Sequence, residues 1–314
     1  MRWSFLLAVM IVACSGGGGG GEKPDNGVSD NGAQDIPGAP EATVDKETGC
    51  VMSPPYNCND PWPQEGNCGV ASEGCTIPPG LDLTGRWYRI DHLYVDSPKG
   101  PTDSDPHGAI AATLSCLWNT QIAKDELVIL FHVTRHDPAK GEIDIEAGSG
   151  IRSFEGSDKC KYRFLANPAP QTVHFKLNGC TFESINGPDN KPVYGMLKIY
   201  PDLITSPIPV VNLLAHGAFS ADGARTIRNG CLNGGICIDA AKAIDFKLNK
   251  SFSGCTNFFK FMDDFNMEAN ATDLPCADQT GKGYVFAGRF DATWIESDFM
   301  DQPKAITRDF SCNE

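Results

Sequence analysis

The sequence predicts a mainly β protein: an antiparallel barrel or sandwich with one or two short helices, preceded by a disordered linker and a small cysteine-rich segment. Two observations favour this fold class. Strand-like segments recur at intervals of about 8–12 residues between Leu81 and Glu314, a spacing typical of barrels and sandwiches. Within Tyr284–Ile295, aromatic residues alternate with polar ones, as in a strand with one buried face.

The first residues have the pattern of a secretory signal peptide. Arg2 supplies a positive charge, and Phe5–Val12 is an apolar run of eight residues. A helix needs about 20 apolar residues to cross a bilayer, so this run predicts a segment that is cleaved rather than retained. The run ends in Ile11-Val12-Ala13-Cys14, and we expect residues 1–13 to be the signal peptide.

These four residues resemble the lipobox of bacterial lipoproteins. The resemblance implies that Cys14 receives a diacylglyceryl group on its sulfur, that the chain is cut after Ala13, and that the new amine is acylated, for example with palmitate. Two or more acyl chains hold a protein firmly at a membrane. Ser15 stands where inner-membrane lipoproteins often carry Asp, which favours the outer membrane, with the periplasmic or the surface face left open.

A linker and a cysteine-rich segment are expected next. Residues 14–48 contain six consecutive glycines at Gly16–Gly21 and almost no large apolar residue, so they cannot bury enough surface to offset the entropy of ordering. Residues 49–79 contain four cysteines and several prolines without a helical or alternating period. Two local disulfides would stabilise this segment, and residues 80–314 form the β-rich domain.

The cysteine count indicates a disulfide-bonded protein. Of 13 cysteines, Cys14 is assigned to lipid, and the even number that remains suits an exported chain. Because no C-x-x-C occurs, neither a zinc ribbon nor a thioredoxin-type motif is indicated. Short loops cost the least chain entropy, so Cys231–Cys237, Cys160–Cys180 and Cys255–Cys276 are the expected pairs. The disulfide candidates are Cys50, Cys58, Cys68, Cys75, Cys116, Cys160, Cys180, Cys231, Cys237, Cys255, Cys276 and Cys312.

Within the β-rich domain, most segments read as strands. The Ala/Leu-rich segment Ala109–Ile122 is ambiguous, and a strand is the preferred interpretation. Helices are expected at Asp239–Phe246 and at Gly254–Glu268, where phenylalanines recur at helical spacing. The other expected strands are Arg86–Val95, Glu126–Thr134, Glu142–Ala147, Tyr162–Leu165, Thr172–Leu177, Tyr194–Tyr200, Val210–Phe219 and Tyr284–Ile295.

Two stretches resemble known families. Leu83–Ile90 contains Gly85-x-Trp87 and resembles the first strand of a lipocalin, which implies a barrel whose base is closed by Trp87. No T-D-Y motif follows, and the domain is longer and richer in cysteine than a lipocalin. Gly217–Gly223 followed by Gly230–Ala241 is similar to a strand–turn–strand–helix unit of β-rich bacterial surface lipoproteins of unknown function.

No catalytic or metal-binding motif is present in the sequence. His132 and His136 are four residues apart, but on a strand that spacing is about 13 Å, too far for one metal ion. Asp263, Asp264 and Glu268 could serve an envelope hydrolase that uses paired carboxylates, which is the alternative function. Such an enzyme needs a second carboxylate across a cleft, and no sequence feature supplies it.

The formal net charge of −14 excludes a nucleic-acid partner on electrostatic grounds. The expected function is that of a lipid-anchored binding or structural module of the bacterial cell envelope, not an enzyme and without cofactor. Its expected partners are the membrane, through the lipid, and a small apolar ligand, a glycan or another envelope protein.

Overall fold

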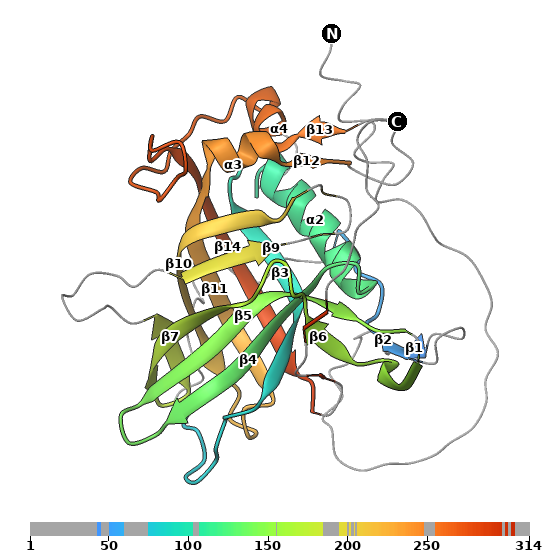
Figure 1. Cartoon of the computed structure of the whole chain (residues 1–314), viewed down its shortest axis with the longest axis vertical. Helices are drawn as coiled ribbons and strands as arrows, with labels where there is room; N and C mark the ends of the chain where they lie inside the picture. The colour runs from blue at the N-terminus through green and yellow to red at the C-terminus, as the bar shows by residue number, and fades with distance from the viewer. Residues whose placement is uncertain are drawn as a thin grey trace.

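The computed structural model describes residues 43–44, 50–59, 75–102, 107–154, 156–184, 195–199, 201, 204, 206–247, 255–296, 299–300 and 303–304. Its main feature is an eight-stranded antiparallel barrel (Figure 1). The prediction of a mainly β fold is therefore confirmed, with a barrel rather than a sandwich. The barrel strands are β3 (Trp87–Ser97), β4 (Val128–Asp137), β5 (Glu142–Arg152), β7 (Gln171–Asn178), β8 (Thr181–Ser184), β10 (Ile208–Phe219), β11 (Thr226–Cys237) and β14 (Gly283–Trp294).

The barrel strands follow one another around the wall in the order of the sequence. The wall closes because β11 pairs with β14 on one side and with β10 on the other, while β14 pairs with β3. Closure leaves these strands without a free edge for pairing with other chains. Two short strands are added to the wall: β6 (Tyr162–Phe164) pairs with β5, and β9 (Gly195–Ile199) pairs with β10.

The remaining elements lie around the barrel. At one end, α3 (Ile238–Ala243) and α4 (Phe258–Asp264) gather with the small β12–β13 pair, and α2 (Ala109–Ala123) runs beside them (Figure 1). The other elements are β1 (Thr43–Val44), β2 (Val51–Met52), η1 (Gly156–Asp158), β12 (Asp245–Phe246) and β13 (Thr256–Asn257).

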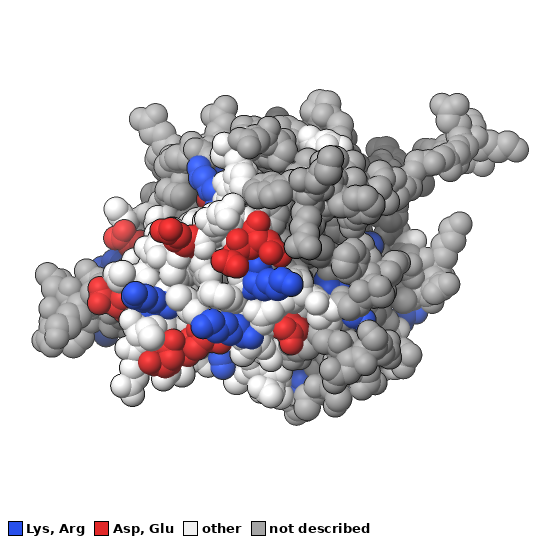
Figure 2. All heavy atoms as spheres, turned by 90° about the horizontal axis from the view of Figure 1, so that it is seen from above, with Lys and Arg blue, Asp and Glu red and all other residues white. Residues whose placement is uncertain are grey.

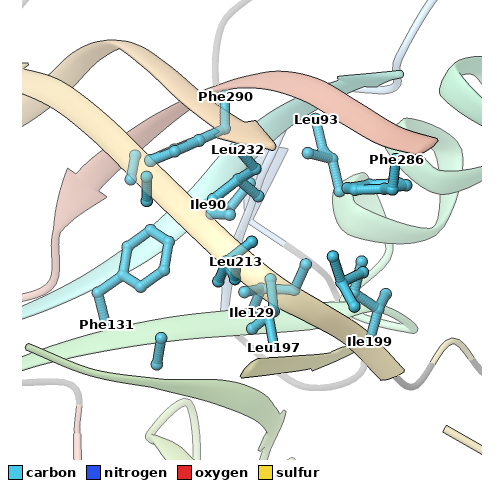
Figure 3. Packing of buried hydrophobic residues seen from close by; sticks show 14 of the residues in the cluster. Ile90, Leu93, Ile129, Phe131, Leu197, Ile199, Leu213, Leu232, Phe286 and Phe290 are labelled. Carbon is cyan, nitrogen blue, oxygen red and sulfur yellow. The ribbon is translucent and has the colours of Figure 1, made fainter. Parts of the chain in front are cut away.

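The core fills the barrel interior. Along β3, Tyr88 and Ile90 face inward, and Leu93 and Val95 continue the inward row after an irregularity in pairing. In Figure 3, buried side chains from several strands of the wall point toward one another, among them Phe131, Leu213 and Phe290. Alternation with a period of two thus gives each strand one face for this core.

The segment Ala109–Ile122, expected as a strand, is a helix, so that prediction was wrong. Ile110, Leu114, Trp118 and Ile122 recur every fourth residue and are all buried. Residues at i and i+4 share one face of a helix, whereas a strand with this sequence would bury alternate positions. The helical period was readable, and the apolar character of the intervening residues obscured it.

Helix α2 occupies a gap in the barrel wall. Strand β3 pairs with β4 only from Trp87 to Arg89. Beyond that point the side-chain amide of Asn119 accepts a hydrogen bond from the Leu93 N–H (2.7 Å) and donates one to the Leu93 carbonyl (3.0 Å). The Ser115 hydroxyl accepts a hydrogen bond from the Val95 N–H (2.8 Å). Two helix side chains therefore replace the missing strand-to-strand pairing.

Other expectations met mixed outcomes. The expected helices exist but are shorter, as α3 and α4, and β8 was not anticipated. Thr43–Val44, within the expected linker, forms β1 and pairs with β2, so order begins before residue 49. The expected signal peptide, Cys14 and residues 15–42 lie outside the described residues.

We predict that Asn119→Leu strongly destabilises the protein. The substitution leaves the Leu93 N–H and carbonyl buried without partners, and each such group costs about 1–3 kcal/mol, so the free energy of unfolding should fall by roughly 2–5 kcal/mol. Urea denaturation measures this change. Thr120→Ala, the adjacent half-buried position, is the matched control and should change little. Equal effects at both positions would contradict the role of Asn119.

We predict that the two ends of the linker respond differently to truncation. Deleting residues 15–40 should leave the melting temperature unchanged, because their composition provides nothing to bury. Extending the deletion to residue 47 removes β1, which pairs with β2, and should lower the melting temperature. Thermal melts of both forms test this, and a loss of stability in the shorter deletion would show that residues 15–40 dock on the barrel.

Candidate functional site

The barrel interior, the expected site for a small apolar ligand, is filled with aromatic rings. The Phe131 and Phe290 rings lie 5.3 Å apart, and the Phe175 and Phe182 rings 5.2 Å apart. The cavity between these side chains measures about 20 Å³, and its lining is entirely apolar. A single water needs about 10–15 Å³, and apolar cavities stay dry. The described interior therefore has no room for a drug-sized ligand.

Glycine makes this dense packing possible. The ring of Phe182 stands over Gly217, where an added Cβ would lie 2.8 Å from the ring. Gly230 carries the ring of Phe290 in the same way. Large rings thus lie directly against the backbone of β10 and β11. Glycine at these strand positions allows the close approach that a filled barrel requires.

A second pocket lies outside the barrel interior, between α2 and the elements β12 and α4 at the end of the barrel. One wall is the α2 face formed by Leu114, Leu117, Trp118 and Gln121. The opposite wall is apolar and is formed by Ile204, Ile208, Ile244, Phe246 and Phe258, with Pro201 and Lys247 also lining the pocket. Its enclosed space is about 20 Å³, the same as in the barrel interior.

Gln121 is the feature that makes this pocket a candidate site. The residue is 3% exposed, and its side-chain oxygen is buried without a hydrogen-bond partner among the described residues. A pocket with apolar walls and one or two fixed polar groups is the usual form of a small-molecule site. The sequence analysis did not identify Gln121, since a single glutamine in an Ala/Leu-rich segment carries no motif.

A second unusual feature is a buried ionic cluster on the outer face of the barrel. The Asp125 carboxylate lies 2.9 Å from the Arg89 guanidinium and 2.8 Å from that of Arg152. The Tyr162 hydroxyl donates to the same carboxylate over 3.1 Å. All three charged side chains are at most 5% exposed. Burial raises the pKa of Tyr162, which keeps its phenol protonated.

The N-terminal segment covers this cluster. The Ser53 hydroxyl lies 3.1 Å from the Arg89 guanidinium, and the Met52 sulfur 3.4 Å from that of Arg152. The Cys50–Cys160 disulfide fixes the same segment beside β6. Cys50, Met52 and Ser53 thus pack against the outside of the barrel, beside the ionic cluster. Sequence reasoning missed the cluster, although Arg89 stands among apolar residues in an expected strand.

An exposed charged row crosses the outer face of β4, β5 and β7. Asp144 accepts hydrogen bonds from Arg135 (2.6 and 3.0 Å) and contacts His174 (2.8 Å). Hydrogen bonding from Arg135, followed by that from His174, lowers the pKa of Asp144. A lowered carboxyl pKa contributes stability above the unfolded-state pKa that is lost as the pH falls through the folded-state value. The charged side chains of this row pair with one another, as is usual on the solvent-facing side of a sheet.

Trp87, the expected barrel-closure residue, packs outside the barrel core. It belongs to a separate cluster with Leu130 and Phe164, and its ring stacks on His132 (4.3 Å) and on Phe299 (5.3 Å). The next residue, Tyr88, faces inward instead. The Tyr88 hydroxyl donates to the Ala224 carbonyl (2.8 Å), and burial raises its pKa to about 12. Arg86 also donates to the carbonyls of Gly223 and Ala224 beside it.

The other residues weighed for chemistry do not form a site together in the described part of the chain. His132 and His136 both lie on β4, where His136 accepts the Leu83 N–H. Asp263, Asp264 and Glu268 are exposed on or after α4. Potential ligand atoms of Cys237, Asp239 and Cys276 lie within 4.8 Å of one another. The two cysteines form a disulfide, however, and are not available as metal ligands.

Disulfides are present, but the expected pairs were wrong. The observed pairs are Cys50–Cys160, Cys58–Cys116, Cys75–Cys180 and Cys237–Cys276, and Cys231 and Cys255 are also disulfide-bonded. Cys231 and Cys237 lie on one strand six residues apart, roughly 20 Å at 3.3 Å per residue, beyond the reach of a disulfide. Cys160 and Cys180 lie near opposite ends of β5. Spatial proximity in the fold, not loop length, decides the pairing.

Consequently, the cysteine-rich segment is bonded to the barrel rather than to itself. Cys50, Cys58 and Cys75 reach the turn before β6, the middle of α2 and the turn between β7 and β8, respectively. The local disulfides expected within residues 49–79 are thus contradicted for these three cysteines. Cys68 and Cys312 lie outside the described residues.

Comparison with known proteins adds no family assignment. No family model, curated protein or solved structure matches the chain. Within the described ranges, no helix has both the length and the hydropathy needed to span a bilayer.

We predict that Asp125→Asn destabilises the protein by about 3–5 kcal/mol, because it removes the buried carboxylate that pairs with both Arg89 and Arg152 and leaves Arg89 with the longer contact to Asp91 (3.4 Å). Asparagine tolerates the positive φ of 56° at this position, so the backbone should be retained. Urea denaturation measures the change. Arg135→Gln, which removes the ion pairs of a half-exposed arginine with Asp144 and Glu142, is the comparison and should cost less, about 1 kcal/mol or below. Similar effects of both variants would refute the importance of burial.

Proposed function

We propose that the chain is a lipid-anchored, disulfide-stabilised module of a bacterial cell envelope, at the outer membrane. In this proposal Cys14 carries the lipid, and residues 15–42 connect the membrane to the barrel. The observation that supports the proposal most directly is the covalent attachment of the N-terminal segment to the barrel through Cys50, Cys58 and Cys75. Such bonds persist in oxidising compartments outside the cytosol, in agreement with the signal-like N-terminus.

The module acts by binding rather than by catalysis in this proposal. The aromatic filling of the barrel makes the interior a scaffold, which leaves the ends and the outer surface for contacts with a ligand or an envelope partner. The exposed charged row, with its charges already paired, does not favour a strongly charged partner.

We predict that Cys14→Ser releases the protein from the membrane fraction or leaves it as an uncleaved precursor, since the variant has no sulfur to receive the diacylglyceryl group. Membrane fractionation and intact mass of the wild-type and variant proteins measure both outcomes. The control is Ser15→Ala, which leaves the cysteine in place and should remain membrane-bound. An unmodified Cys14 in the mature wild-type protein would refute the anchor.

A further inference from the structure

Residues 50–58 form a strap across the outside of the barrel. The strap is bonded at one end by Cys50–Cys160, beside β6, and at the other end by Cys58–Cys116, on α2. Between these bonds, Ser53 and Tyr56 lie against side chains of the outer face of β3. The chain that would lead to the membrane therefore meets the barrel along its side, at a covalent bond.

The disulfides of the N-terminal segment are arranged in series along the chain. A pull from before Thr43 first separates β1 from β2, which two residue pairs join in the described part of the chain. The pull then arrives at Cys50–Cys160. Cys58 follows eight residues later and Cys75 further still, so their disulfides carry no load from this direction while the first one holds. A pull on the N-terminus thus enters the barrel at Cys160.

Cys160 passes this pull to the end of β5. The Cys160 N–H donates to the Ser153 carbonyl (2.8 Å) and the Ser153 N–H to the Lys161 carbonyl (2.9 Å), which closes the chain between β5 and β6. Strand β5 pairs with β4 over nine residue pairs and with β7 over six. A pull toward the opposite end of the barrel runs parallel to these strands and loads their pairings together. Strands are already nearly extended and can lengthen little under tension.

Helix α2 would be a weaker point of entry. Without Cys50–Cys160, the pull would pass along the strap to Cys58–Cys116, in the middle of α2. A helix rises only about 1.5 Å per residue, so its chain can more than double in length when it is pulled. Two side chains, Asn119 and Ser115, bond α2 to the backbone of β3. The order of the disulfides thus protects the element that fills the gap in the barrel wall.

Charge does not hold the barrel against a bilayer, which leaves the tether to bear a pull. The formal net charge is −14, whereas an anionic lipid surface attracts basic segments. Figure 2 views the molecule from above, toward the end where α3 and α4 lie, and shows basic and acidic side chains interspersed over the described surface. The surface in this view offers no wholly basic patch that would draw the barrel onto the lipid.

We propose that the barrel is a load-bearing link, in which a pull on the membrane tether enters at Cys50–Cys160 and is carried by β5 and its neighbours while α2 stays in place. This inference rests on the proposed membrane anchor and adds the kind of partner. The partner is large and is itself fixed in place, since only such a partner, and not a freely diffusing small molecule, puts the tether under tension.

Single-molecule force spectroscopy of the full chain carrying Cys14→Ser tests this load path. One handle is attached at the N-terminus. The other is attached at position 222, in the exposed β10–β11 turn, which lies at the opposite end of the barrel from Cys160. The force at which the barrel begins to unfold is measured for this parent and for two disulfide variants.

We expect Cys50→Ser/Cys160→Ser to begin unfolding at a force about twofold or more below that of the parent, because forced unfolding follows the barrier along the loaded path and the pull then enters through α2. The matched control is Cys58→Ser/Cys116→Ser, which should unfold at the force of the parent, since the missing bond lies behind the first one. A second measurement on the parent leaves every cysteine of the barrel in place. With the N-terminal handle moved to Asn59, just beyond Cys58, the pull reaches α2 first and the unfolding force should again fall.

Melting temperatures separate this load path from ordinary stabilisation. Each variant loses one disulfide, so both should melt below the parent, whereas only Cys50→Ser/Cys160→Ser should be weaker under force. Equal unfolding forces in the two variants would overturn the proposal, as would equal forces from the N-terminal and Asn59 handles. These measurements are made without the lipid, so the anchor, tested by membrane fractionation, stands or fails separately.

Discussion

The structure depends on how the backbone of β3 is satisfied after this strand separates from β4. A barrel is stable in part because every strand has partners on both sides, and an unpaired buried N–H or carbonyl is costly. Here the pairing of β3 with β4 ends at Arg89, and α2 takes over with Asn119 and Ser115. The gap admits a helix into the wall, and the helix brings Trp118 and Gln121 to the end of the barrel. The same local departure from regular pairing thus creates the pocket.

The N-terminal segment belongs to the barrel for electrostatic as well as covalent reasons. Asp125, just after α2, neutralises two arginines from β3 and β5, and residues 52 and 53 contact those arginines from outside. A buried ion pair adds little net stability by itself, but breaking one is expensive. Detaching this segment from the barrel would expose the ionic cluster to water and would also require the Cys50–Cys160 disulfide to break. The point where the chain leaves the barrel is therefore fixed.

Sequence reasoning predicted what is periodic and local. Alternating apolar residues predicted most of the strands, and the expected strands Glu126–Thr134 and Glu142–Ala147 do pair, as β4 and β5. It failed where tertiary contacts decide. The disulfide partners are set by which turns meet in space. Helix α2 was misjudged because the apolar residues between Ile110, Leu114, Trp118 and Ile122 obscured its helical period. Gln121 and Asp125 carry no motif, since their importance comes from burial and from neighbours distant in sequence.

A fixed exit point gives a proposed membrane tether a geometric consequence. The described chain begins at Thr43 in β1, which pairs with β2 near β6, whereas α3 and α4 lie at one end of the barrel (Figure 1). Between Cys14 and Thr43 there are 28 residues, and a flexible glycine-rich chain of that length has a root-mean-square span of about 30 Å. That span is comparable with the size of a small domain. In the proposed arrangement, that reach would allow the end with α3 and α4 to face either the membrane or the surrounding medium.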